Sequence, residues 1–221
     1  MKLDTRNRDI IIIGYYGQGN FGDDLLALYI IRLLKKAVSE NRIMVTAPEG
    51  NYLEKWFPEI MSVSLPYALH HLTDSPKSVV FGGGGLFFQF EKPSLMNLFG
   101  ARGNLMWHCL RHARIELKNN LRLYAFCIGI GPLNGYGAKF ITRKLCSITD
   151  HVSVRDESSA KFINAVNCEI VTDPVLGLSD LIVCDNFSHG KAVGFIIRCW
   201  YSSDKLIVKL KQVAEKLRQE G

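Results

Sequence analysis

The sequence predicts an α/β protein built on an open parallel sheet with helices on both faces. Three observations support this fold class. Strand-like runs alternate with helical patterns along most of the chain, as in βαβ units. Residues 10–13 are all isoleucine, which is typical of a strand buried on both faces. Three of the strand-like runs lead into glycines, which are common at the ligand-binding edge of such sheets.

The expected elements follow one another in chain order. The first strand, near 9–14, leads into a helix near 22–38 whose broad apolar face includes Leu26 and Leu33. Further strand-like runs predict strands near 42–47, 61–64, 78–82, 121–128, 151–155 and 168–172. Helical patterns between them predict helices near 51–57, 66–73, 95–118, 137–148 and 157–166.

A change in composition divides the chain into two parts. Residues 185–191 are polar and contain glycine and asparagine, so they predict a linker after a first domain of residues 1–184. Residues 192–221 hold one strand pattern and one amphipathic helix pattern, about 204–219. A lone βα unit cannot bury both of its apolar faces. We therefore expect it to begin a second domain, and the alternative is that it joins the edge of the first sheet.

Composition excludes several classes of protein. The chain has 221 residues, of which 48% are apolar and 22% charged, as in ordinary globular proteins. Its longest apolar run is too short to cross a bilayer, and its first residues lack the pattern of a secretory signal. The six cysteines form no Cys-x-x-Cys pair, which favours reduced thiols in a cytoplasmic protein over disulfides or a zinc site.

The charge of the chain indicates the kind of ligand. A formal net charge of +6 favours phosphates, acidic sugars or lipid headgroups. Nucleic acid fits less well, because no block of lysines and arginines is interleaved with aromatic residues. A basic and apolar pattern at 94–119 could rest on a membrane surface, although packing on the sheet is the commoner explanation. His108 and His112 could face one metal ion, but no third ligand is apparent and a solvated helix face is preferred.

Glycines at three strand ends form the candidate binding site. In an open α/β sheet, ligands bind outside the carboxyl ends of the strands, where glycine lets a ligand approach the main chain. Each glycine alone could simply make a tight connection, but three such ends in one chain favour a shared crevice. The candidate ligand-binding glycines are Gly17, Gly19, Gly22, Gly83, Gly84, Gly85, Gly129 and Gly131.

A dinucleotide site is an alternative for the first of these loops. Residues 17–22 match the pattern Gly-x-Gly-x-x-Gly. However, Asp23 and Asp24 follow at once, and their carboxylates would repel a pyrophosphate and compete for the same N–H groups. The acid expected to hold the ribose is also displaced, because the nearest one after the second strand is Glu49. A nicotinamide or flavin enzyme is therefore disfavoured.

Five motifs occur in a fixed order along the first domain. They are Gly-Tyr-Tyr-Gly-x-Gly-Asn-Phe-Gly-Asp-Asp at 14–24, Gly-Gly-Gly-Gly-Leu-Phe at 82–87, Gly-Ile-Gly-Pro-Leu at 129–133, Val-Ser-Val-Arg-Asp-Glu-Ser-Ser-Ala at 152–160 and Thr-Asp-Pro-Val-Leu at 172–176. In order and spacing they resemble the polysaccharide pyruvyl transferases. Residues 192–200 are similar to the first strand of that family's second domain, with Cys199 where proline is usual.

The resemblance implies a fold and an activity. The fold would be two Rossmann-like domains facing across a cleft, a GT-B-like architecture of which this chain holds the first half. The activity would be transfer of a pyruvyl group from phosphoenolpyruvate to two hydroxyls of a lipid-linked or polymeric saccharide, as a ketal, in cell-surface polysaccharide synthesis. No cofactor is expected besides this donor substrate. The location would be the cytoplasm, with peripheral contact at the inner face of the membrane as one option.

This chemistry needs cations for the donor's phosphate and carboxylate, and at least one acid/base group. Arg155 and Arg198, each at the end of an expected strand, are the candidate anion ligands. The alternative is a salt bridge to a nearby carboxylate for Arg155 and simple exposure for Arg198. Asp23 and Asp24 could orient the acceptor or take a hydroxyl proton. Alternatively, the two aspartates cap the helix and hold the glycine turn.

Two polar residues complete the candidate site. Asn20 could bind a sugar hydroxyl or cap the helix, and Asp173 ends a strand at the same edge, where a turn role is the alternative. Two other functions remain open at this point. One is a nucleotide-sugar glycosyltransferase of the same GT-B-like fold, and the other is a non-catalytic single-domain fragment.

Overall fold

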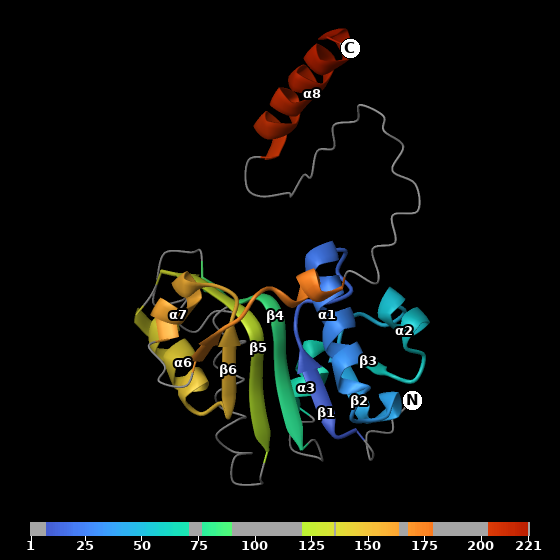
Figure 1. Cartoon of the computed structure of the whole chain (residues 1–221), viewed down its shortest axis with the longest axis vertical. Coiled ribbons are helices and arrows are strands. Elements are labelled where there is room, and N and C mark those ends of the chain that lie inside the picture. The colour runs from blue at the N-terminus through green and yellow to red at the C-terminus, as the bar shows by residue number, and fades with distance from the viewer. Residues whose placement is uncertain are drawn as a thin grey trace. The chain divides into compact units, whose positions relative to one another are not determined.

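The computed structural model describes residues 8–70, 77–89, 121–134, 136–163, 168–178 and 203–220 (Figure 1). The chain divides into two compact units, Met1–Ile182 and Val183–Gly221. The strands of the first unit are β1 (Ile10–Ile13), β2 (Ile43–Thr46), β3 (Met61–Val63), β4 (Ser78–Gln89), β5 (Arg122–Leu133), β6 (His151–Val154) and β7 (Cys168–Ile170). Its described helices are α1 (Phe21–Leu34), η1 (Glu40–Arg42), α2 (Tyr52–Trp56), α3 (Leu65–His70), α6 (Tyr136–Ser147), α7 (Glu157–Ile163) and η4 (Pro174–Gly177).

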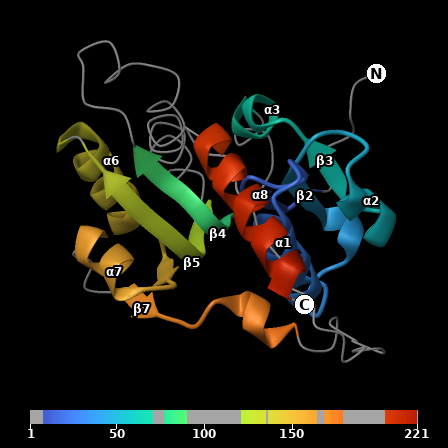
Figure 2. The same ribbon diagram turned by 90° about the horizontal axis from the view of Figure 1, so that it is seen from above.

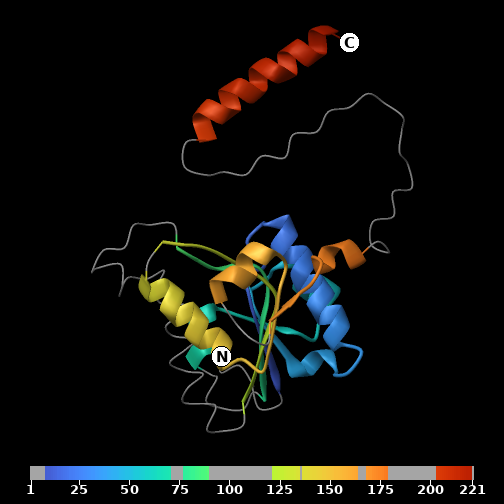
Figure 3. The ribbon, with the colours of Figure 1, turned by 60° about the vertical axis from the view of Figure 1, so that its left-hand side comes forward.

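The described strands form one seven-stranded sheet in the order β3-β2-β1-β4-β5-β6-β7. Every pair in it is parallel. Helices cover both faces, with α1 and α2 packed on one core and α3, α6 and α7 on the other (Figure 3). The expected α/β class, a Rossmann-like open parallel sheet, is confirmed. All seven predicted strands are present, and two of them extend beyond their predicted ends.

The isoleucine run of β1 is central because both of its faces are buried. Ile11, Ile12 and Ile13 are each at most 1% exposed. Ile11 and Ile13 join the core beneath α3, α6 and α7, whereas Ile12 joins the core beneath α1 and α2. Each such side chain contributes about 1.5–3 kcal/mol on burial. A uniformly apolar run therefore predicts an interior strand better than an alternating one would.

The sheet changes winding direction between β1 and β4. From β1 the chain proceeds to β2 and β3 on one side, and from β4 it proceeds to β5, β6 and β7 on the other. In open α/β sheets, ligands bind at the carboxyl ends of the strands beside such a junction. The loop after β1 and the glycine run of β4 both lie at this junction.

Two strands are longer than the sequence predicted. The expectation that the strands end at their glycines is wrong for β4, which continues through residues 82–85 to Gln89, and for β5, which continues through Gly129 and Gly131 to Leu133. The two strands pair with each other over this extension, with irregular register beyond Gly85. Each strand supplies hydrogen-bond partners to the other, so the ladder persists where glycine composition alone would indicate a turn.

Several predicted features lie outside the described residues. These are the helix near 95–118, the linker 185–191 and the strand 192–198. In the second unit the structure describes one helix, α8 (Ser203–Glu220), which confirms the helix expected at about 204–219. That this unit begins a second Rossmann-like domain stays a prediction. None of the described helices has the length and hydrophobicity needed to cross a membrane.

Candidate active site at the carboxyl edge of the sheet

The predicted site residues that the structure describes come from the carboxyl edge of the sheet, the upper edge in Figure 1. They lie in the loop after β1, on the extensions of β4 and β5, and in the segments after β6 and β7. Arg198 is outside the described residues. Parallel strands bring these segments to one edge although they are far apart in the chain.

Asp24 holds the glycine loop after β1 in place. Its side chain is 7% exposed, and one carboxylate oxygen accepts a hydrogen bond of 2.7 Å from the N–H of Gly17. Gly17 has a φ of +68°, a conformation that glycine adopts readily. Burial, and then the adjacent Asp24 carboxylate, raises the pKa of Tyr52. For Asp24, the geometry supports the structural alternative, in which its carboxylate holds the glycine turn.

Asp23 lies closer to the surface than Asp24. Its carboxylate accepts a hydrogen bond from the side-chain amide of Asn20 and lies against the main chain of Gly84. Asn20 stands at the position before α1, but its side chain makes no capping hydrogen bond. The first-turn N–H groups of α1 therefore have no side-chain cap from Asn20.

The glycines of β4 differ in what surrounds them. A Cβ atom added to Gly83 would stand 2.8 Å from Leu26, and one added to Gly84 would collide with Asp23. Gly83 and Gly84 thus make room for α1 and its first turn. By contrast, a Cβ at Gly85 would meet nothing within 4 Å, and the same is true of Gly19 in the first loop. At Gly85 and Gly19 the main chain is therefore accessible to a ligand.

Tyr16 joins the first loop to β4 across the junction. Its ring is 1% exposed, and its hydroxyl donates a hydrogen bond to the carbonyl of Gly82. Burial, with a smaller contribution from the carboxylate of Asp23, raises the pKa of Tyr16 far above its ordinary value. The hydroxyl therefore stays protonated and fixes the loop against the strand.

Arg155 extends over the end of β5. A Cβ atom added to Gly129 would stand 2.9 Å from Nε and from Nη2 of Arg155, so this glycine accommodates the guanidinium. Gly129 is the register partner of Gly85 on the adjacent strand. Arg155 also lies 3.7 Å from the carboxylate of Asp156, yet its side chain remains 40% exposed. The salt bridge expected as the alternative is therefore formed with Asp156, and the exposure of the guanidinium is compatible with the predicted role of anion ligand.

The remaining predicted residues have local structural partners. The carboxylate of Asp173 accepts a hydrogen bond of 3.1 Å from the N–H of Val175 and caps η4, which is the turn role. Gly131 has a φ of +100°, and a Cβ there would stand 2.5 Å from the ring of Phe162. Gly22 has open space, because the nearest atom to an added Cβ is Oδ1 of Asn20 at 3.9 Å.

A return segment, residues 171–178, runs from β7 back toward α1 along this edge (Figure 2). The N–H of Val171 bonds to the carbonyl of Val154, and η4 packs on α1, where Gly177 lies against the ring of Tyr29. The segment therefore links the last strand of the sheet to the helix that follows the first.

The family model for polysaccharide pyruvyl transferases matches residues 20–217, most of the chain. The chain belongs to the polysaccharide pyruvyl transferase family. It is therefore a transferase, and the resemblance seen in the five sequence motifs is confirmed. No curated protein and no solved structure shows significant similarity to it.

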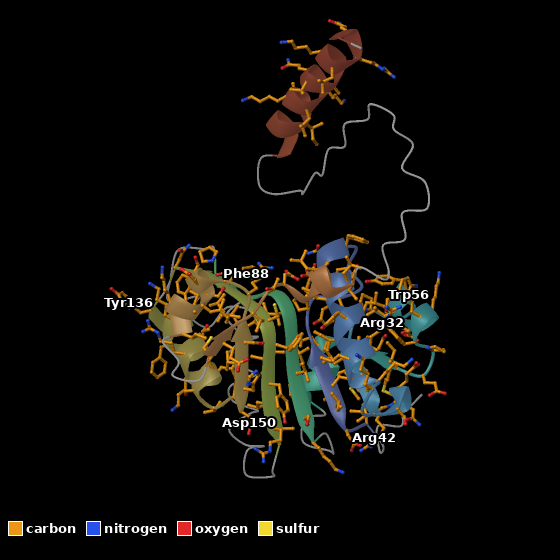
Figure 4. All side chains as sticks on the ribbon, viewed as in Figure 1. Arg32, Arg42, Trp56, Phe88, Tyr136 and Asp150 are labelled. Atoms are coloured by element: carbon orange, nitrogen blue, oxygen red, sulfur yellow. The ribbon has the colours of Figure 1, made fainter. Side chains whose placement is uncertain are left out.

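The sequence analysis of this pyruvyl transferase missed three exposed aromatic residues at the carboxyl edge of the sheet. Tyr15 and Phe21 flank the first glycine loop and are 60% and 76% exposed, and Phe88 near the end of β4 is 42% exposed (Figure 4). The first two belong to the motif at 14–24. Their exposure could not be inferred from that motif, because the neighbouring Tyr16 is buried.

Cys127 is another residue that the sequence analysis did not single out. It has a φ of +49°, which is uncommon for a residue with a side chain and costs free energy that the surrounding structure must offset. Its N–H bonds to Oγ of Ser153 at 2.9 Å. Burial, and then the charge of Asp173, raises the pKa of the Cys127 thiol to about 11. The thiol is therefore neutral, and it donates a weak hydrogen bond of 3.8 Å to the carbonyl of Thr172, which links β5 to the segment after β7.

The sequence analysis considered one possible metal site, at His108 and His112, and preferred a solvated helix face. Among the residues that the structure describes, no group of three histidine, cysteine or acidic side chains could hold a metal ion. His108 and His112 lie outside these residues.

Proposed function

We propose that this pyruvyl transferase moves a pyruvyl group from phosphoenolpyruvate to two hydroxyls of a lipid-linked or polymeric saccharide during cell-surface polysaccharide synthesis. The observation that carries the proposal is the family match over residues 20–217. The arrangement at the carboxyl edge supports it, because an exposed arginine, a surface carboxylate and open main chain come from neighbouring elements there.

The reaction defines what the site must do. The methylene carbon of phosphoenolpyruvate gains a proton and becomes a methyl group. The adjacent carbon forms bonds to two sugar oxygens, and its bond to the phosphate oxygen breaks. One of the two hydroxyl protons balances the proton taken up by the methylene, and the other leaves with phosphate or solvent. The chemistry needs cations, a proton donor and a proton acceptor, and no cofactor beyond the donor substrate.

Arg155 is the proposed anion ligand in this part of the chain. Its exposed guanidinium can bind the phosphate or carboxylate of the donor through two parallel hydrogen bonds. The N-terminus of α1 adds partial positive charge at the same edge. Arg198 remains a proposed second ligand, from a second domain that would complete a GT-B-like cleft.

Asp23 is the proposed proton acceptor for a sugar hydroxyl. Its carboxylate is held by the Asn20 amide beside Gly84, and the open main chain of Gly85 follows Gly84 directly. Asp24 supports the site indirectly, because its carboxylate fixes the glycine loop. Exposed Phe21 offers a flat apolar surface to a sugar ring at the start of α1.

We place the reaction in the cytoplasm, at or near the inner face of the membrane where a lipid-linked acceptor would be found. Three cysteines of the described residues, Cys127, Cys146 and Cys168, are free thiols, which supports a reducing compartment.

The test measures phosphate release from phosphoenolpyruvate by the full-length protein across a broad panel of saccharides. Arg155→Ala should lower kcat/KM for phosphoenolpyruvate about 10–100-fold, since charge-assisted hydrogen bonds of about 1.5–3 kcal/mol are lost. Arg155→Lys should recover only part of it, because lysine lacks the planar fork. The control is Arg122→Ala, which breaks a 2.6 Å ion pair with Asp150 at the opposite, amino edge (Figure 4).

Two results would count against the proposal. The first is absence of phosphate release across the whole panel. The second is thermal stabilisation by UDP- or GDP-sugars without any by phosphoenolpyruvate, which would favour the nucleotide-sugar glycosyltransferase instead.

A further inference from the structure

A hollow of about 480 Å³ lies outside the candidate active site, between the second half of α1 and the end of α2. Its lining residues are three cations and two aromatic side chains: Arg32, Lys35, Lys55, Trp56 and Phe57. Figure 4 shows the labelled Arg32 and Trp56 on the side of the sheet that α1 and α2 cover. No residue of this hollow takes part in the proposed reaction.

The cations and the aromatic rings of the hollow are organised together. The ammonium of Lys35 lies 5.1 Å from the centre of the Phe57 ring, a cation–π contact, and also pairs with Glu40. Trp56 is 53% exposed, and the adjacent Lys55 is exposed as well. The hollow thus presents a flat indole surface bordered by positive charge.

Structural roles explain only part of this arrangement. Arg32 and Lys55 lie in the last turns of their helices, where cations are favoured by the helix dipole. The helix dipole does not explain why the large indole of Trp56 is exposed beside the hollow. An aromatic face beside cations suits a ligand with a flat apolar side and a negative group.

The distance between the hollow and the candidate active site sets the length of a ligand that could occupy both. Arg32 is nine residues beyond Asp23 on the same helix, about 14 Å along its axis. A ligand that occupies both the candidate active site and the hollow must therefore be extended. A polymer meets this condition and a single small molecule does not.

We propose that the hollow binds an acidic sugar residue of the polymeric acceptor, at a distance from the residue that reacts. The indole of Trp56 stacks on the sugar ring, and the exposed Lys55 pairs with its carboxylate. The proposal rests on the proposed function for its choice of a saccharide. An anionic lipid surface is the competing occupant, because an exposed indole beside lysines also suits a membrane interface, and the vesicle measurement below distinguishes the two.

Isothermal titration calorimetry of the full chain with octagalacturonate, an acidic oligosaccharide, tests the proposal. Neutral maltooctaose serves as the uncharged comparison. Octagalacturonate should bind, maltooctaose should bind much more weakly, and added salt should weaken the first interaction. Trp56→Ala and Lys55→Glu should each weaken it about tenfold. Lys36→Glu, an equal charge change at a neighbouring exposed lysine that does not line the hollow, should leave it unchanged.

Three outcomes would overturn the proposal. The first is that octagalacturonate does not bind the native chain. The second is that it binds, but neither Trp56→Ala nor Lys55→Glu weakens the binding. The third is that the native chain binds anionic phosphatidylglycerol vesicles and not the oligosaccharide, and that the two variants lose the vesicle binding. Circular dichroism melting confirms that the variants are folded. Phosphoenolpyruvate binding is measured separately in the same variants, so failure of the hollow and failure of the proposed reaction give different results.

Discussion

Replacing Tyr16 with phenylalanine should destabilise the protein measurably while leaving its shape intact. The ring is 1% exposed, and its hydroxyl donates to the carbonyl of Gly82 in the interior. Removing the hydroxyl keeps the packing but leaves that carbonyl without this donor, which costs about 1–2 kcal/mol. For a chain of this size, the loss corresponds to a fall in Tm of about 2–8 °C. Urea unfolding of Tyr16→Phe and the native protein measures the difference.

The pH dependence gives the same reasoning a second test. The pKa of Tyr16 is raised in the folded protein above its ordinary value of 10.0, so above pH 10 the unfolded chain releases this proton while the folded chain retains it. The stability that the hydroxyl contributes is present below pH 10 and is lost as the pH rises further. The gap between the native protein and Tyr16→Phe should therefore narrow above pH 10.

The adjacent Tyr15 provides the matched control. It is 60% exposed, so Tyr15→Phe should change the free energy of unfolding by less than about 0.5 kcal/mol. Equal stabilities of Tyr16→Phe and the native protein would refute the assignment of a stabilising hydrogen bond across the junction. A gap that stays constant through alkaline pH would refute the assignment of a shifted tyrosine.

Three further predictions concern individual contacts. Gly83→Ala should cost about 1–3 kcal/mol in a denaturant melt, because its φ of +43° and the adjacent Leu26 oppose a side chain, whereas Gly85→Ala should cost little. Asp24→Ala should lower the free energy of unfolding by about 1–3 kcal/mol through the lost Gly17 bond, and equal stability would contradict its structural role. Cys127 should resist iodoacetamide in the native protein at neutral pH, as read by mass spectrometry, since its thiol is buried with a pKa of about 11.

The fold was largely predictable because its signals are local. The isoleucines of β1 are uniform because they are buried on both faces, and this pattern is legible without a structure. The length of β4 was not predictable in the same way. Whether a run of glycines continues as a strand depends on pairing with β5, and that partner lies more than 30 residues away in the sequence.

The candidate site was predictable in its location but not in its detail. The sequence places Asp23, Asp24 and Arg155 at one edge, and they are found there. It does not reveal which carboxylate is buried or which glycine is covered. Those outcomes depend on how α1 packs on β4, since a shift of one position along a helix turns a side chain by a large angle. Gly83 and Gly85 look equivalent in the sequence, and only the packing of Leu26 separates them.

The return segment, residues 171–178, has a mechanical consequence for the whole edge. It starts at the outermost strand on one side of the β1–β4 junction and ends against α1. The segment therefore connects the two halves of the sheet at its carboxyl edge, where substrates would enter. Moving them apart there would require breaking the contact of η4 with α1, where Gly177 lies against Tyr29. This end of the sheet therefore keeps its width, and the exposed side chains on it, such as Arg155, are the parts that can move without breaking that link.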